Sequence, residues 1–272
     1  MTDLFWLSLA VKLGATALIV VAACLVVERS GPVVGAMVAT LPVSAGPAYA
    51  FLAMEHDAGF LAASALGSMA ALGATAVFVS AYAAVAQRHG RFTSIAAALA
   101  AWLAFLVPAH WAGGSLAAAG ALDAATLAAC FFLVRRWRSA PLVARGRPSR
   151  WDIPIRALAA MGVVAAVLLI GRLLGPGVAG IAALAPVVMT SLGLLLHPRL
   201  GGRGAAAVLA NTLPGIAGNI LAIAALHLSA EALGSAPALL LSLAITLAWN
   251  AGAVALQRWL QARALAPGAR RP

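Results

Sequence analysis

A succession of apolar runs, each close to the length that crosses a lipid bilayer, limits the possible folds of this chain most. About 20 consecutive apolar residues span a bilayer as a helix. Counted by that rule, the sequence predicts nine spans: Leu4–Val27, Pro32–Met54, Gly59–Ala86, Phe92–Pro108, Gly114–Val134, Pro154–Ile170, Val178–Leu196, Gly204–Leu228 and Ala236–Leu256. The chain is 64% hydrophobic and 9% charged, whereas soluble domains are roughly 45–50% apolar and about 25% charged. We therefore predict an all-α polytopic integral membrane protein.

The first apolar run is expected to be a membrane span and not a cleaved signal peptide. The opening of the chain is acidic, its apolar run is too long for the core of a signal peptide, and no small-residue cleavage site precedes a soluble domain. The net charge of +11 would suggest nucleic-acid binding in a soluble protein. Here the arginines lie between apolar runs, so they are interpreted as topology signals and no nucleic-acid partner is expected.

Arginines are concentrated in every second connection between spans, and this pattern predicts the orientation of the chain in the membrane. The connections after the first, third, fifth, seventh and ninth spans carry arginines, including a long basic segment over residues 136–153 and a basic tail over residues 258–272. The other connections hold a single arginine, Arg172, and no lysine. Basic connections mark the cytoplasmic side. We predict a multi-pass protein of the bacterial inner (plasma) membrane, with the N-terminus outside and the C-terminus in the cytoplasm.

A short pattern occurs twice and predicts an internal duplication. GPVVGAMVATLP at Gly31–Pro42 returns as GPGVAGIAALAP at Gly175–Pro186, with both glycine-proline starts and both final prolines kept. An odd number of spans separates the two copies, so the halves would have opposite orientations, as in many secondary transporters. The predicted arrangement is a first four-helix repeat (1–110), a linking helix (111–135), the basic loop, a second four-helix repeat (154–257) and the tail.

The segment SGPVVGAMVATLPVSAGPAYAFLA, with four spans around it, resembles the GlpM-like family of small four-helix membrane proteins. The resemblance covers roughly Lys12–Pro108 and, more weakly, Arg156–Asn250. Four-helix units working as inverted pairs are also similar to the small multidrug resistance proteins and the wider drug/metabolite transporter superfamily. Those small exporters carry an embedded glutamate in their first helix. This chain has Lys12 there, which argues against proton-coupled cation export.

Two charged residues lie inside predicted spans and are candidates for a site. Lys12 is in the first span and Asp123 is in the fifth. Both spans start from the outer side, so the two charges are predicted at one depth, as a buried pair. Charges at such depth are costly and usually serve a purpose. The alternatives are a structural salt bridge, a lysine that extends to the interface, or a charge that binds solute or a coupling ion.

Polar and proline residues gather in four of the predicted spans. In the second and seventh spans, prolines free backbone carbonyls that can line a cavity, unless they only mark tight helix packing. In the eighth and ninth spans, amides can bind a polar solute or join helices by hydrogen bonds, and Asn211 and Asn219 are predicted to share one helix face. The candidate substrate-binding residues are Lys12, Thr40, Pro42, Ser44, Pro47, Asp123, Pro186, Thr190, Asn211, Asn219 and Asn250.

The sequence contains no motif typical of catalysis, metal binding or cofactor binding. Histidines and cysteines are scattered, and no phosphate-binding loop or nucleophile motif occurs. We expect no enzyme activity, no catalytic residues, no metal and no cofactor. The favoured function is secondary transport of a small polar or anionic solute in the lipid bilayer. The alternatives are a non-transporting scaffold or accessory subunit and, third, an integral-membrane enzyme; the sequence leaves substrate and oligomeric state open.

Overall fold

The computed structural model describes residues 2–29, 45–112, 114–139 and 151–265, and all secondary structure in those ranges is helical. The helices are α1 (Thr2–Arg29), α3 (Ala45–Glu55), α4 (Ala58–Val85), α5 (Arg91–Ala112), α6 (Leu116–Val134), the short 3₁₀ helix η1 (Arg135–Trp137), α7 (Asp152–Leu174), α8 (Pro176–Ala183), α9 (Val187–Ala210), α10 (Leu213–Leu233) and α11 (Ser235–Leu265). The predicted all-α class is confirmed for the described residues.

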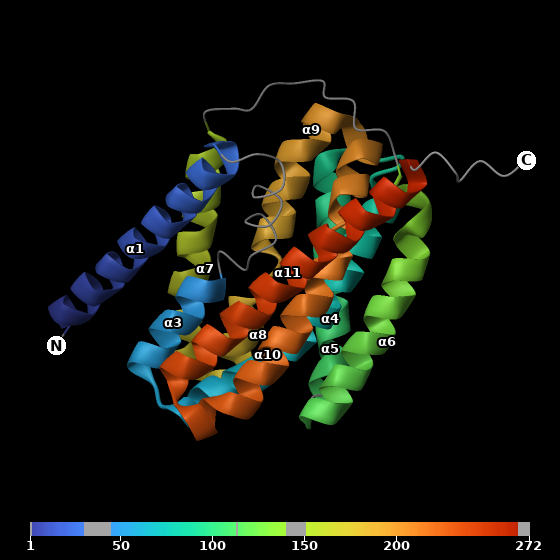
Figure 1. Cartoon of the computed structure of the whole chain (residues 1–272). Coiled ribbons are helices and arrows are strands. Elements are labelled where there is room, and N and C mark those ends of the chain that lie inside the picture. The colour runs from blue at the N-terminus through green and yellow to red at the C-terminus, as the bar shows by residue number, and fades with distance from the viewer. Residues whose placement is uncertain (1, 30–44, 113, 140–150, 266–272) are drawn as a thin grey trace, which may run out of the picture.

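Helix α4 is the centre of the bundle, with α5, α6, α8, α9 and α10 packed around it (Figure 1). Its sequence contains no charged residue, and small side chains cover all its faces, so it can be buried on every side. Asp57 begins it: the side chain accepts a hydrogen bond of 2.8 Å from the backbone N–H of Phe60, which satisfies one of the free donors of a helix start.

Six stretches within the described residues are long and apolar enough to cross a membrane: Ala58–Val85, Arg91–Ala109, Leu116–Trp137, Ile153–Leu174, Pro176–Leu233 and Ser235–Leu256. The fifth of them covers 58 residues, and a straight helix of that length would be about 87 Å long. It is instead interrupted between α8 and α9, at Gly201 within α9, and between α9 and α10. Gly201 has φ +72°, a conformation that glycine adopts readily.

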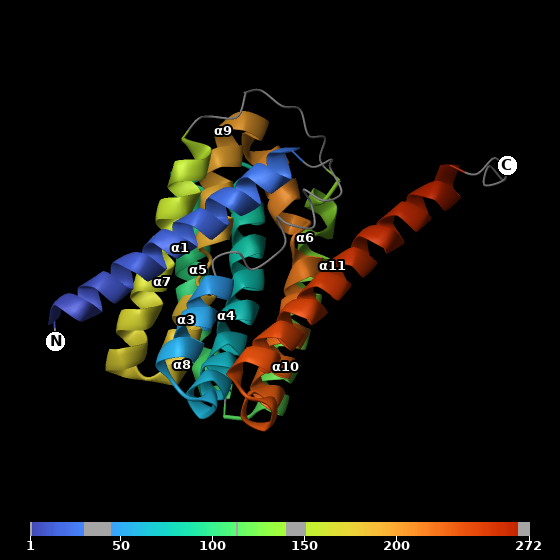
Figure 2. The same ribbon diagram turned by 60° about the vertical axis from the view of Figure 1, so that its left-hand side comes forward.

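The ends of the helices gather on two sides of the bundle, as Figure 1 shows. The starts of α4, α6, α8 and α11 lie at the lower end of that view. The end of α4, the start of α5 and η1, with its neighbouring arginines, lie at the opposite end. Two helices leave this compact arrangement. Figure 2 shows α1 diverging toward its N-terminal end and α11 diverging toward its C-terminal end.

Of the two copies of the glycine-proline pattern, the second lies within the described residues. Gly31–Pro42 lies outside the described residues. In the second copy, Gly175 has φ +82° and Pro176 follows as the first residue of α8. Pro186 closes the copy at the break between α8 and α9. Proline suits the first turn of a helix and interrupts a helix interior, so the second copy encodes one short helix with a defined start and end.

Candidate functional site

The seventh predicted span is broken, as its proline suggested. Helix α8 ends at Ala183, and Leu184, Ala185 and Pro186 precede α9. The backbone N–H of Val187 donates to the carbonyl of Ala185, 2.7 Å away, rather than to the carbonyl of Ala183. The Thr190 hydroxyl donates to the carbonyl of Pro186, 2.8 Å away. Pro186 and Thr190 therefore form the start of α9, and the carbonyl of Ala183 loses its helical donor.

Helix α8 is held against α4 by very close backbone contact. A Cβ added to Gly180 would meet the carbonyl oxygen of Ser64, and one added to Gly67 would meet the backbone of Gly177. The hydroxyl of Ser68 also donates to the carbonyl of Gly180, 2.8 Å away. Glycines at both positions let the backbones approach. These contacts fix α8 against α4 directly before the break.

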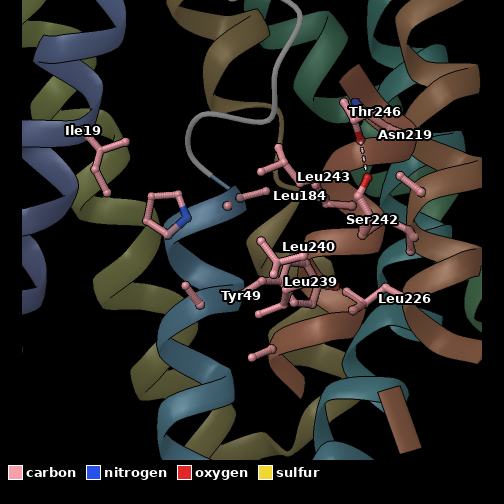
Figure 3. Close-up of a pocket in the computed structure, with 17 residues that line it drawn as sticks. Ile19, Tyr49, Leu184, Asn219, Leu226, Leu239, Leu240, Ser242, Leu243 and Thr246 are labelled. Carbon is pink, nitrogen blue, oxygen red and sulfur yellow. Dashed lines mark hydrogen bonds between the residues drawn. The ribbon is translucent and has the colours of Figure 1, made fainter. Parts of the chain in front are cut away.

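A partly open cavity of about 530 Å³ lies beside this break. Figure 3 shows the residues that line it. They come from the start of α3, from the break itself through Leu184, from α10 and α11, and from α1 through Ile19. The lining is mostly alanine and leucine and contains no charged side chain. The cavity thus has the size of a site for a small molecule and an apolar wall.

Polar groups lie at one end of the cavity. Asn219, Ser242 and Thr246 lie together in Figure 3, with leucines from α10 and α11 beside them. The Thr246 hydroxyl donates to the carbonyl of Ser242, 3.1 Å away. The side-chain oxygen of Asn219 is buried and accepts no hydrogen bond within the described residues. A buried acceptor without a partner is unfavourable, but this oxygen is also closed off from the empty cavity. The amide of Asn219 would have to rotate for its oxygen to meet a bound molecule.

Tyr49 connects the cavity wall to α4 and α8. Its hydroxyl is hydrogen-bonded to the hydroxyl of Ser68 and lies 3.2 Å from the carbonyl oxygen of Ser64. Because Ser68 also donates to Gly180, the side chain of Tyr49 joins α3 to the contact between α4 and α8. No role was predicted for Tyr49 or Ser68 from the sequence. The position of Tyr49, two residues after Pro47, could have drawn attention to it. Its hydrogen-bond partners lie on another helix, however, and could not be identified from the sequence.

The remaining candidates of the second span divide into two groups. Thr40, Pro42 and Ser44 lie outside the described residues. Pro47 is buried, lines the cavity and stands in the first turn of α3, although it was predicted to break a helix. In a first turn proline removes a donor that has no helical acceptor anyway, so Pro47 causes no break within α3.

The amides of the eighth and ninth predicted spans are also separated. Asn211 lies between α9 and α10 and is exposed: its oxygen accepts from Nε of Arg138 at 3.0 Å, and its nitrogen donates to the Arg138 carbonyl at 3.1 Å. Asn219 lies inside α10. The prediction that these two share one helix face is wrong, because the break before Leu213 places them on different elements. Asn250 is buried on α11 but does not line the cavity.

Lys12 forms an ion pair, but not with the predicted residue. Its ammonium contacts the carboxylate of Glu55, which also accepts from Arg172 at 3.2 Å. These charges come from α1, from the end of α3 and from the end of α7. Burial alone would raise the pKa of Glu55, but Lys12 and Arg172 outweigh burial and hold that pKa below its ordinary value. The predicted pair of Lys12 and Asp123 is wrong.

Asp123 is 1% exposed on α6, which packs against α4, α5 and α10 rather than α1. One carboxyl oxygen lies beside Gly73 of α4, and the other has no hydrogen-bond partner within the described residues. Distance along a helix gives the depth of a residue but not which helices are neighbours, so two charges at a similar depth can lie in different parts of the bundle.

No group of three or more metal-ligating side chains exists among the described residues. Comparison with known proteins adds no further assignment: the chain matches no family model, no curated protein and no solved structure. The site must therefore be interpreted from its own chemistry.

Proposed function

We propose that this protein is a secondary transporter that carries a small solute across the inner membrane by way of the cavity beside the α8–α9 break. One observation supports the proposal most: an uncharged cavity, with the amide of Asn219 in its wall, lies where the break between α8 and α9 meets α3, α10 and α11. Transporters commonly bind solutes near the bilayer midplane at discontinuous helices, and irregular backbone at that depth is tolerated where it lines a cavity.

The same cavity narrows the expected class of solute. The sequence alone favoured a small polar or anionic solute. An anion would need a cationic or strongly donating partner, and the residues that line the cavity include no lysine, arginine or histidine. We infer an uncharged amphipathic solute, whose apolar body lies against the leucines and whose polar group bonds to the amide of Asn219.

The proposal includes nine spans in two inverted four-helix repeats, with basic connections in the cytoplasm. One reversal, at the kink of Gly201 within α9, would divide the 58-residue stretch into two crossings. Helices α1 and α3, which are not among the six stretches, would contribute the other two crossings. The repeat is supported by the glycine-proline pattern and by the break where that pattern ends.

The test combines a deletion strain with purified protein. Metabolites that accumulate in or disappear from the deletion strain supply the solutes, and uptake into proteoliposomes measures their movement. Ala50 lines the cavity and is exposed, so Ala50→Phe has room to fold while filling the cavity and should abolish uptake. Asn219→Leu should weaken solute binding by about 1–3 kcal/mol.

Ala125→Phe is the matched control, because Ala125 is exposed on α6 and does not line the cavity. It should transport like the wild type. Wild-type protein that moves none of the solutes would contradict the proposal and favour a scaffold or accessory subunit. Conversion of a solute into a new compound would favour an integral-membrane enzyme.

A further inference from the structure

Asp123 is a buried carboxyl group whose surroundings the proposed cavity does not explain. It is 1% exposed, while Ala124 and Ala125 beside it on α6 are exposed. Its side chain therefore points into the bundle rather than toward lipid. It is not one of the residues that line the cavity. An acidic residue buried on a helix of this kind is costly, so its retention needs a reason.

Gly73 makes room for this carboxyl group on the central helix. A Cβ at Gly73 would lie 2.5 Å from Oδ1 of Asp123 and 3.0 Å from the ring of Phe105 on α5. Any larger residue would displace either the carboxyl group or the aromatic ring. Oδ2 of Asp123 is buried and has no hydrogen-bond partner within the described residues. The carboxyl group thus lies in a closely packed apolar space, and one of its oxygens makes no hydrogen bond within the described residues.

No cationic group compensates Asp123 within the described part of the chain. The ion pairs there join Glu55 to Lys12 and Arg172. Helix α4 carries no charged residue, and α10 carries His227, whose ring contacts the carbonyl of Ala62, and the exposed Glu231. The titratable groups on α6 and the elements packed against it are Tyr82, Arg91, His110, Cys130, Arg135, Arg136, His227 and Glu231, and no described ion pair joins any of them to Asp123.

A bound proton is the simplest way to neutralise such a group. An ionised carboxylate in an apolar interior without a counter-charge is strongly unfavourable, and such groups usually become neutral. A metal ion is less suitable because hard cations need several oxygen ligands. Most backbone carbonyls of α4, α5 and α6 accept within their helices, although Pro108 leaves that of Ala104 in α5 without its helical donor. Gly73 and Phe105, which lie beside the carboxyl group, offer no side-chain oxygen.

We propose that Asp123 is a reversible proton-binding site, and that binding and release of this proton couple solute movement to the proton gradient. The coupling rests on the proposed transport function; the proton site itself does not. Rearrangement of α6 against α4 and α5 would open the carboxyl group to water, where the ionised form becomes favourable and the proton leaves. Return to the packed state requires the proton again.

Infrared difference spectroscopy in lipid tests the proton site directly. We expect a protonated-carboxyl band in the wild type near neutral pH, absent in Asp123→Asn, that shifts on transfer to D₂O and is lost as the pH rises to about 10. Gly73→Ala should shift this band, because the new Cβ displaces Oδ1. Gly120→Ala is the control: its Cβ would come no closer than 4.0 Å to the Met69 side chain, and the band should not move.

Each opposite result overturns the proposal. Absence of the band near neutral pH would show an ionised carboxylate. A band that neither exchanges with deuterium nor disappears in alkali would show a permanently neutral structural acid. In proteoliposomes that hold a pH-sensitive dye, solute-driven proton movement should be lost in Asp123→Asn. Undiminished proton movement in that variant would overturn the coupling, whereas a titrating band without any solute transport would overturn the proposed function alone.

Discussion

Glu55 illustrates how one residue at a helix end can hold three helices together. It ends α3, and its carboxylate receives Lys12 from α1 and Arg172 from α7. The side chains of Lys12 and Glu55 are only 11% and 12% exposed, whereas that of Arg172 is 46% exposed. Among the described residues, Glu55 has a further ionic partner, Arg172, whereas Lys12 has none. Loss of Lys12 and loss of Glu55 should therefore have different consequences.

Glu55→Gln should destabilise the folded protein more than Lys12→Met. The first change leaves a buried ammonium without its carboxylate, which costs about 3–5 kcal/mol in a fully buried pair and somewhat less here. The second leaves Glu55 paired with Arg172 and should cost about 1–2 kcal/mol. The double variant should recover most of the stability of the wild type, since removal of both charges is often nearly neutral. Thermal unfolding in detergent measures all three.

The pH dependence of unfolding provides the control for this pair. Because the pKa of Glu55 is held below its ordinary value of 4.5, the stabilisation is complete above that pH and is lost as the pH falls through the lower, folded-state pKa. The difference in melting temperature between wild type and Glu55→Gln should therefore shrink in acid. Equal melting temperatures at neutral pH would show that the pair contributes nothing.

At the scale of elements, the contact between α4 and α8 decides where the broken span lies. Gly180→Ala should destabilise the protein by about 1–3 kcal/mol or more, because its Cβ would meet the Ser64 carbonyl and lie 3.0 Å from the backbone nitrogen of Ser68. Backbone atoms cannot move away as a flexible side chain can. Reduced yield and a lower melting temperature of purified protein are the expected measurements.

Gly162→Ala on α7 is the matched control. A Cβ at Gly162 meets nothing within 4 Å, so the substitution should be neutral or stabilise the helix by up to about 1 kcal/mol. If both variants unfolded at the wild-type temperature, α8 would not be held against α4 as described.

The helices could be predicted from the sequence far better than the site. Runs such as Gly59–Ala86 and Gly114–Val134 became α4 and α6 within two residues of the expected bounds, because length and apolarity decide membrane helices. The break between α8 and α9 could also be predicted, from Pro186. The partners of Lys12 and the separation of Asn211 from Asn219 did not follow, because neighbouring helices are chosen by packing between distant segments, as at Gly180 and Ser64.

At the scale of the whole molecule, the helix ends form a basic side and a side with few basic residues. Reporter fusions after Arg91 and after Trp111 should therefore lie on opposite sides of the membrane, with the first in the cytoplasm. Arg91 starts α5 and Trp111 lies at its other end, so one crossing separates the two positions. Paired alkaline phosphatase and fluorescent-protein fusions measure this, and two cytoplasmic reporters would contradict the proposed nine-span count.

The shortness of α8 has a consequence for biosynthesis. Its eight residues extend about 12 Å, less than half the hydrocarbon thickness of a bilayer, which is about 30 Å. Such a segment cannot leave a translocation channel for lipid as an independent span. It must instead meet a surface already in the membrane. Because α4 precedes α8 in the chain, ribosomes deliver that surface first, and the backbone at Ser64, which Gly180 of α8 contacts closely, is already in the membrane when α8 emerges.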